Sequence, residues 1–149
     1  PRDYGMGTTC TAAYIHNGQL SLAHVGDSRC YLIRGGVMQQ ITEDHLFVTE
    51  QLRRGVITPE QAATANHNIL SRALGTDERV PVDLEERNLA EGDVLLLCTD
   101  GLNKEVTDAE ILQVVEQTPD PAELVQRLVD LANAAQGRDN ITVAVARVE

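Results

Sequence analysis

Residues 94–98 form an unbroken apolar run, VLLLC, and this run constrains the fold more than any other feature of the chain. The run is too short for a helix, and turn residues bound it at positions 91–93 and 99–101. It is therefore predicted to be a strand that is buried on both faces. A sheet that contains such a strand needs cover on each side, which two packed sheets with outer helices would supply.

Short alternating segments precede this run and predict further strands. Asn17-Gly18 is a strong signal for a two-residue hairpin, and Gly35-Gly36 marks a second tight turn. We expect four strands with tight connections, joined as an antiparallel meander. These strands span residues 8–16, 19–25, 29–34 and 37–41.

Helical patterns alternate with the strands. A polar, helix-prone stretch at 49–65 is interrupted by Gly55, and Thr58-Pro59 has the pattern of an N-cap followed by the first helical residue. Two more helices and two more strands are predicted from apolar spacing. The helices span 108–117 and 121–135, and the strands span 80–89 and 141–148. The predicted fold class is α+β, a four-layer α-β-β-α sandwich of two mainly antiparallel sheets with outer helices.

The net charge argues against several classes of partner. The formal charge is −11 and Lys104 is the single lysine, so no basic cluster is present to bind nucleic acid. An acidic surface also repels anionic membranes, and no apolar run reaches the roughly 18 residues of a membrane span. A phosphorylated substrate would be repelled as well, unless bound cations reversed the local field.

The remaining composition fits one globular domain. The chain has 149 residues, of which 42% are apolar. Residues 1–4 have neither the basic start nor the apolar core of a signal peptide. Cys10, Cys30 and Cys98 lack the close spacing of a zinc or redox motif, so we expect three reduced, buried thiols in a cytoplasmic protein.

Three aspartates stand at the ends of predicted strands, each with a glycine within two residues. Asp27 follows the second strand, Asp100 follows the apolar run, and Asp139 precedes the last strand. Each alone is most often a turn residue. If these strand ends lie on one side of the sandwich, the carboxylates converge, and three anions cannot share a site without cations or raised pKa values. Oxygen ligands without a nearby His or Cys pair favour Mg²⁺ or Mn²⁺ over Zn²⁺, although this pattern names no reaction.

Six short motifs around these aspartates resemble one family. They are residues 5–9 (GMGTT), 24–29 (HVGDSR), 41–45 (ITEDH), 70–75 (LSRALG), 96–102 (LLCTDGL) and 137–143 (GRDNITV). In this order and approximate spacing they resemble the metal-dependent Ser/Thr phosphatases of the protein phosphatase 2C family, particularly the compact bacterial type. One motif would be weak evidence, but six in sequence make a strong match.

The resemblance implies roles for the aspartates and their neighbours. Asp100 and Asp139 would be ligands of a pair of Mn²⁺ or Mg²⁺ ions, and Asp27 with Asp100 would hold the third ion seen in many bacterial members. Asn140 would lie beside the metal ligands, and the backbone of Gly101 would lie near the site. No side chain is assigned as catalytic, because the implied reaction is hydrolysis of phosphoserine or phosphothreonine in proteins by metal-activated water.

The resemblance also implies a flap at residues 44–70, next to the active site, that affects substrate choice. Relatives often carry a His-Pro and basic residues where this chain has residues 64–68 (TANHN), so substrate contacts through the flap are not implied. His45 and His67 border this segment, where a structural role and a role near the substrate both stay open. Arg29 is expected to pair with a carboxylate rather than with a phosphate.

The complete domain of this family begins upstream, with motifs that supply a phosphate-binding arginine, a bridging aspartate ligand and a backbone carbonyl ligand. Residues 1–149 contain none of these motifs, so we expect an incomplete catalytic domain that lacks its N-terminal part and is inactive alone. The alternative is a non-catalytic phosphatase-like module for binding or regulation, and an Asp-Gly motif in the upstream sequence would favour the enzyme. The expected partner is a phosphoprotein, and an exposed sheet edge would also favour self-association.

Overall fold

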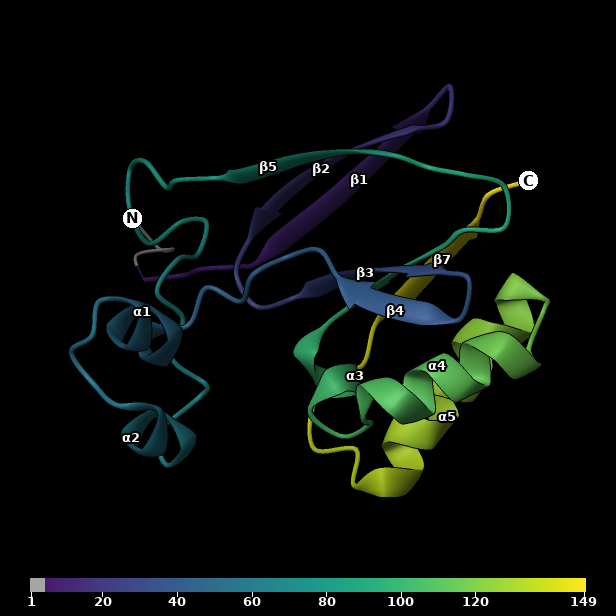
Figure 1. Ribbon diagram of the computed structural model, residues 1–149. Coiled ribbons are helices and arrows are strands. Elements are labelled where there is room, and N and C mark those ends of the chain that lie inside the picture. Colours follow the sequence, from purple (N-terminus) through teal and green to yellow (C-terminus); the bar gives the residue numbers. More distant parts are fainter. Residues whose placement is uncertain (1–4) are drawn as a thin grey trace.

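The computed structural model describes residues 5–149, which form two antiparallel sheets and five helices (Figure 1). The first sheet has the order β1-β2-β5, with strands Cys10–His16, Gln19–Val25 and Asp83–Asn88. The second has the order β4-β3-β6-β7, with strands Val37–Gln40, Arg29–Arg34, Val94–Cys98 and Val143–Arg147. The predicted α+β class with two antiparallel sheets is confirmed. The prediction made from residues 1–4, that they are not a signal peptide, lies outside the described residues.

The first four strands form two hairpins rather than one meander. Asn17 and Gly18 have φ angles of 49° and 71°, as a tight two-residue turn between β1 and β2 requires. β3 and β4 form the second hairpin. The predicted meander is wrong because β2 and β3 belong to different sheets. The chain crosses between the sheets at Gly26, whose φ of 114° is open to glycine but rarely to other residues.

β6 is a central strand of the second sheet and is paired on both sides, with β3 and with β7. Its side chains alternate between two cores: Leu95 packs between the two sheets, and Leu96 packs on the opposite, helix-covered face. Both are almost fully buried, with 1% and 0% exposure, which confirms the predicted strand with two buried faces. Burial of each leucine stabilises the fold by about 1.5–3 kcal/mol.

Helices α4 (Asp108–Gln117) and α5 (Pro121–Ala135) cover the outer face of the second sheet (Figure 1). Both begin where their sequence predicted. Thr107 caps α4 through a capping box, and Asp120 caps α5. The buried stripe of α5 repeats every fourth residue, at Leu124, Leu128 and Ala132. No helix in the described part of the chain is long and apolar enough to cross a membrane.

The helix-prone stretch at 49–65, predicted to be interrupted at Gly55, forms two short helices, which lie at one end of the sheets (Figure 1). They are α1 (Phe47–Arg53) and α2 (Pro59–Ala63). The break falls around Gly55, which has a φ of 68° and cannot easily be replaced there by another residue. Thr58 caps α2 through a capping box, as its sequence indicated.

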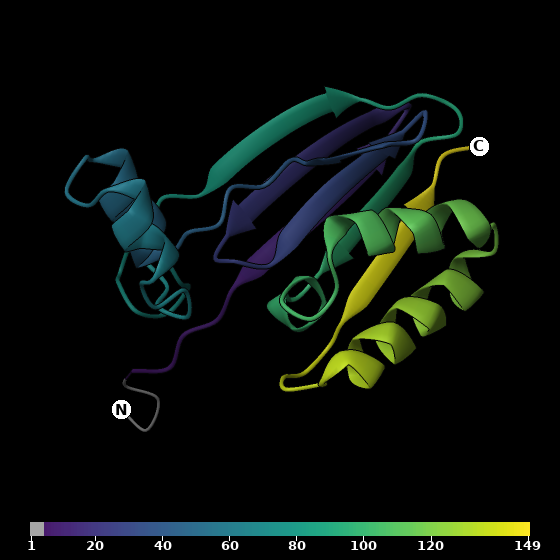
Figure 2. The ribbon, with the colours of Figure 1, turned by 60° about the horizontal axis from the view of Figure 1, so that its bottom comes forward.

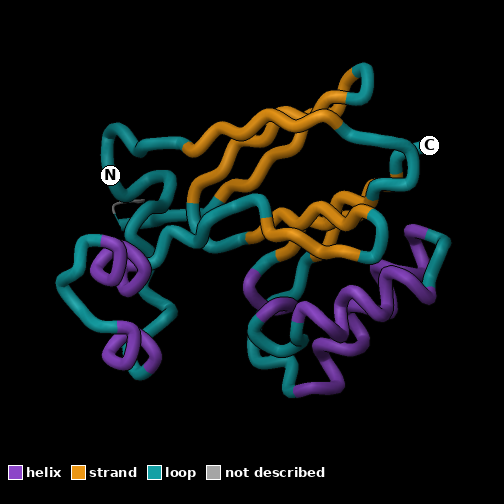
Figure 3. The backbone as a smooth tube through the Cα atoms, in the orientation of Figure 1, coloured by secondary structure: helices purple, strands orange, loops and turns teal. Residues whose placement is uncertain are grey.

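The outer face of the first sheet carries exposed side chains. Tyr14 on β1 and Leu84 on β5 are 65% and 77% exposed, and no helix formed by residues 5–149 covers this face (Figure 2). Residues 5–149 therefore form three of the four predicted layers, namely α4 with α5, the second sheet and the first sheet (Figure 3). Self-association through exposed edges stays a prediction.

The cysteines are free thiols, as predicted. Cys30 and Cys98 are buried in the second sheet, but Cys10 is exposed, so the prediction of burial is wrong for Cys10. The reason is the position of β1, which pairs on one side only, with β2, and is exposed along almost its whole length. A strand-like sequence pattern does not distinguish such an edge strand from a central one.

Candidate functional site

Asp100 and Asp139 lie at the same end of the second sheet, because the end of β6 pairs with the start of β7. Hydrogen bonds of the Thr99 side chain hold the two segments together beyond the ends of these strands. The hydroxyl of Thr99 donates to Asn140 O at 3.2 Å and accepts from the Thr142 N–H at 2.9 Å. The segment that carries Asp139 is therefore held against the segment that carries Asp100.

Gly101 makes this close approach possible. A Cβ at residue 101 would lie 3.0 Å from the carbonyl carbon of Asn140 and nearer still to its oxygen. Gly101 belongs to α3 (Asp100–Asn103), a short helix that the sequence did not predict. Together with Asp100 and Asp139 it lines an open cavity of about 690 Å³, and its place near a metal site stays a prediction.

Asp27 lies near Asp100. It follows Gly26 at the crossing between the sheets, and β3, which begins two residues later, pairs with the end of β6. Asp27 and Asp100 line a second, smaller cavity of about 170 Å³. Burial raises the pKa of Asp27, and the negative charge of Asp100 raises it further. The two carboxylates are therefore close enough to repel each other.

The structure brings the carboxylates together in pairs. Asp100 lines both cavities, whereas Asp27 lines the smaller one and Asp139 lines the larger one. Within residues 5–149, no three His, Cys, Asp or Glu side chains are grouped closely enough to hold a metal ion. The assignment of all three aspartates as metal ligands stays a prediction, and a cation held by either pair needs further oxygen ligands.

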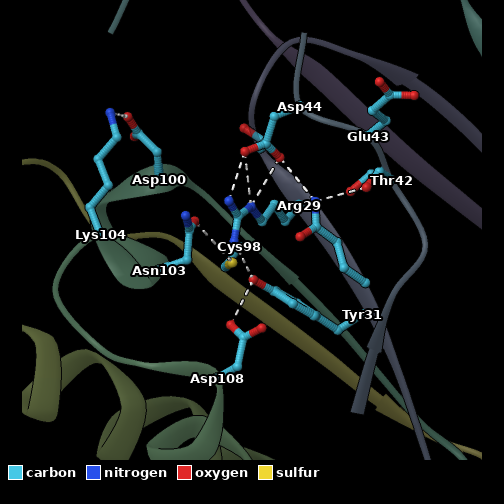
Figure 4. Close-up of polar contacts among 12 residues, drawn as sticks. Arg29, Tyr31, Thr42, Glu43, Asp44, Cys98, Asp100, Asn103, Lys104 and Asp108 are labelled. Carbon is cyan, nitrogen blue, oxygen red and sulfur yellow. Dashed lines mark hydrogen bonds and ion pairs between the residues drawn. The ribbon is translucent and has the colours of Figure 1, made fainter. Parts of the chain in front are cut away.

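Lys104 places a positive charge beside Asp100. Its Nζ lies 2.6 Å from Asp100 Oδ2 and donates to Asn68 Oδ1 at 2.8 Å (Figure 4 shows the pair with Asp100). The two side chains meet because they are four residues apart across the end of α3. The sequence indicated Lys104 only as the single lysine, but its spacing of four from Asp100 is a signal that could have placed it here.

The donor atoms of the aspartates fit a hard divalent cation. Carboxylate oxygens are the ligands that Mg²⁺ and Mn²⁺ prefer, and a cation would relieve the repulsion between Asp27 and Asp100. Asn140 lies next to a candidate ligand, and its backbone N–H donates to Asp139 Oδ1 at 2.7 Å. A role for the side chain of Asn140 beside the metal ligands stays a prediction.

Arg29 is paired with a carboxylate, as the sequence predicted. Its Nε and Nη2 donate to the two carboxylate oxygens of Asp44 at 2.9 and 2.7 Å, and its Nη1 donates to the Tyr31 hydroxyl at 3.0 Å (Figure 4). That hydroxyl donates in turn to Asp108 at 3.3 Å. Arg29 therefore fastens the segment before α1 to β3, and its guanidinium is engaged by protein groups rather than directed at a phosphate.

The flap-like segment 44–70 borders both cavities. His67 lines both of them, and Asn68 lines the larger one. The ring of His67 is held by α2, because its Nε2 donates to Ala62 O at 3.1 Å. The residues in which this chain departs from the family pattern, 64–68, thus include two that line the candidate site.

Two buried histidines lie behind the site. His24 and His45 are 2% and 3% exposed, and their ring centroids are 4.7 Å apart. His24 Nε2 donates to Glu43 O at 3.0 Å, so this ring holds the segment before His45. The sequence did not predict the partner of His45, because Asp83, whose Oδ2 lies 2.9 Å from His45 Nε2, is 38 residues away. No short-range spacing carries a signal for such a pair.

Comparison with known proteins identifies the family. A sequence model of the family described as Protein phosphatase 2C matches residues 2–141. This chain belongs to the protein phosphatase 2C family. The serine/threonine protein phosphatase PstP of Mycobacterium tuberculosis is 45% identical over 145 residues, which cover 97% of this chain and 28% of PstP. The serine/threonine phosphatase stp of Listeria innocua is 44% identical over 142 residues, which cover 93% of this chain and 56% of that protein.

Solved structures agree with this assignment. The serine/threonine phosphatase of S. agalactiae matches with a TM-score of 0.90 and 40% identity, over 97% of this chain and 60% of that chain. The catalytic domain of PstP, solved in complex with two manganese ions, matches with a TM-score of 0.84 and 44% identity, again over 97% and 60%. The predicted family is confirmed, and this chain spans less than two thirds of each of these relatives.

Proposed function

We propose that this chain contributes Asp27, Asp100 and Asp139 to the active site of a protein serine/threonine phosphatase that depends on Mn²⁺ or Mg²⁺. The observation that carries the proposal is the paired end of β6 and β7, where Asp100 and Asp139 line one cavity, while Asp27 and Asp100 line a second. The relatives support the reaction, since they are named serine/threonine phosphatases. One relative supports the cofactor, since it was solved with two manganese ions.

Each aspartate has a separate part in this proposal. Asp100 and Asp139 would hold the pair of cations, and Asp27 with Asp100 would hold a third. When bound, the cations would supply an activated water and charge neutralisation for the hydrolysis of phosphoserine or phosphothreonine. They would also overcome the repulsion between a phosphoprotein and a chain with a formal charge of −11.

We further propose that residues 1–149 are an incomplete catalytic domain with little or no activity alone. The chain spans 60% of the PstP catalytic domain that was solved with manganese. Its three candidate ligands lie in two pairs, and residues 5–149 offer no group of three that could hold an ion. Ligands supplied by residues outside 5–149 would complete the coordination of the cations.

Hydrolysis of p-nitrophenyl phosphate with Mn²⁺ tests both proposals. The assay compares the 149-residue chain with a complete domain, in which the N-terminal part of the family precedes this chain. We expect activity in the complete domain only, and a loss of about 100-fold or more for Asp100→Asn or Asp139→Asn, because even residues behind a metal ligand contribute 10–100-fold. Asp130→Asn is the matched control, since Asp130 lies exposed on α5 and its side chain accepts a hydrogen bond from Gln126. Comparable activity of the isolated chain, or full activity of Asp100→Asn, would refute the proposals.

The second candidate function is a non-catalytic phosphatase-like module for binding or regulation. The lack of any three-ligand group in residues 5–149 favours it. Titration of the complete domain with Mn²⁺ by calorimetry separates the two functions. Mn²⁺ binding that Asp100→Asn weakens favours the phosphatase, whereas binding of a phosphopeptide without Mn²⁺ and without turnover favours the module.

A further inference from the structure

His45 stands at the start of the flap-like segment and is joined to the turn that carries Asp27. Gly26, the residue before Asp27, donates its N–H to the ring Nδ1 of His45 at 3.0 Å. The backbone N–H of His45 donates back to Gly26 O at 2.8 Å. Both backbone polar groups of Gly26 are therefore bonded to this one residue, which is itself only 3% exposed.

The position of the ring hydrogen on His45 follows from its partners. Because the Gly26 N–H can only donate, Nδ1 carries the lone pair and the hydrogen of the neutral ring is on Nε2. Nε2 donates to Asp83 Oδ2 at 2.9 Å, and Arg72 Nη1, which lies 3.2 Å from Nε2, donates to the other oxygen of that carboxylate at 2.7 Å. The imidazole is thus oriented by a carboxylate that is itself held in place.

The same residue holds the base of the flap-like segment. Ser71, just past its end, donates its N–H to His45 O at 2.8 Å. Phe47 and Ile69 pair one step further in, with an N–H···O distance of 2.9 Å. His45 therefore connects both ends of the segment to the turn before Asp27.

The conformation of Gly26 sets the direction in which Asp27 leaves β2. Gly26 has a φ of 114°, and a Cβ at this position would collide with the side chain of Thr9. A glycine has no side chain to anchor it by packing, so its hydrogen bonds to His45 supply the constraint. A small rotation of this turn would move the carboxylate of Asp27 relative to Asp100, with which it shares a cavity.

We propose that His45 is a positioning residue, which holds the Gly26–Asp27 turn so that the Asp27 carboxylate stays beside Asp100 at the predicted cation site. This inference rests on the proposed function, which makes Asp27 a metal ligand. The alternative is that His45 only fills volume in the core. The two roles predict opposite rankings of the same substitutions.

Two variants of His45 separate these roles. His45→Phe keeps the ring volume but removes both nitrogens, whereas His45→Asn loses volume but keeps an oxygen that can accept from the Gly26 N–H. Mn²⁺ binding is measured by calorimetry and by electron paramagnetic resonance on the complete domain, in which the N-terminal part of the family precedes this chain. His16→Phe is the matched control, because His16 is exposed at the end of β1, where its ring stacks on that of Tyr14.

We expect His45→Phe to weaken Mn²⁺ binding by about 10-fold or more and His45→Asn to weaken it by about 3-fold or less, as for other residues that orient metal ligands. His16→Phe should bind as the wild type does. The proposal is wrong if His45→Phe keeps the wild-type affinity, or if His45→Asn is the weaker binder of the two.

Amide hydrogen exchange tests the positioning without any metal. In His45→Phe the amides of Asp27 and Ser28 should exchange about 10-fold faster, whereas those of β6 should not change, because only the turn is released. Equal acceleration throughout the protein would show a general structural role and would overturn the proposal. If the wild-type complete domain binds no Mn²⁺, the proposed function fails, while the exchange rates still decide whether His45 holds the turn.

Asp83→Asn serves if His45→Phe does not fold. Asp83 is 47% exposed, so its substitution is tolerated more easily than that of a buried residue. The neutral side chain at position 83 would no longer offer the His45 Nε2–H a charged acceptor. Exchange of the Asp27 amide should therefore become faster, but by less than in His45→Phe. Unchanged exchange at Asp27 in this variant would contradict the proposal.

Discussion

Replacing Gly101 by alanine tests whether the close approach of two loops forms the candidate site. Gly101 lies in α3 and is not among the residues with positive φ, so alanine suits its backbone conformation. In an exposed helix this change would stabilise the protein by about 0.5–1 kcal/mol, because alanine has the higher helix propensity. At Gly101 the added Cβ meets the backbone of Asn140 instead.

The steric cost outweighs the gain in propensity. The Cβ would lie 3.0 Å from the carbonyl carbon of Asn140 and 3.3 Å from Ile141 Cγ1, whereas carbon atoms prefer about 3.5–4.0 Å. The segment before β7 must therefore move by roughly half an ångström or more, and such overpacking costs about 1–3 kcal/mol. After the gain in helix propensity is subtracted, we expect Gly101→Ala to destabilise the protein by roughly 1 kcal/mol.

Thermal denaturation followed by circular dichroism measures this change. A loss of about 1 kcal/mol lowers Tm by about 2–4 °C in a protein of this length. Gly7→Ala is the matched control, since Gly7 also lacks a positive φ and its Cβ would first meet a side-chain methyl of Thr76, at 3.1 Å. A Gly101→Ala variant that is as stable as the wild type, or more stable, would show that the loops do not approach as described.

Two further predictions concern the thiols and the response to pH. Cys10 should react with a thiol reagent in the folded protein, whereas Cys30 and Cys98 should react only after unfolding, since they are buried and burial raises the pKa of each to about 12. Rapid reaction of three thiols in the native state would contradict this. Burial lowers the pKa of His24, and the neighbouring His45 lowers it further. The His24 imidazole therefore binds a proton more readily in the unfolded chain than in the folded protein, so the free energy of unfolding should fall as the pH drops below about 6.5. Urea denaturation at pH values of about 7.5 and 5.5 measures the difference, which should shrink in His24→Gln and would refute the reasoning if it did not.

The sequence predicted the elements of this fold better than their arrangement. Residues 94–98 were predicted to be a strand with two buried faces because they are five consecutive apolar residues, whose side chains point to both faces of a strand. In the structure they form β6, which is buried on both faces. The first four strands were found, yet their assignment to one meander was wrong, because Gly26 sends the chain into the second sheet. A glycine between two strands is compatible with a turn inside one sheet and with a crossing between two, and only packing distinguishes them.

The residues of the candidate site could likewise be predicted from the sequence, but their arrangement could not. Asp27, Asp100 and Asp139 could be selected from the sequence because each stands at the end of a predicted strand with a glycine within two residues. That they lie in two pairs around Asp100 depends on strand register and on the cavities at that end of the sheet. The ion pair of Lys104 with Asp100 was within reach of the sequence, since a spacing of four residues is a local rule.

By itself the sequence determined the class of the fold, the family and the chemistry of the candidate ligands, because periodicity, caps and short motifs are local properties of the chain. Tertiary structure alone decided that His45 bonds to Gly26 and Asp83, and that Asn140 lies against Gly101. These contacts join residues 19 to 39 positions apart, at distances set by how the sheets pack, and no local pattern of residues encodes such distances.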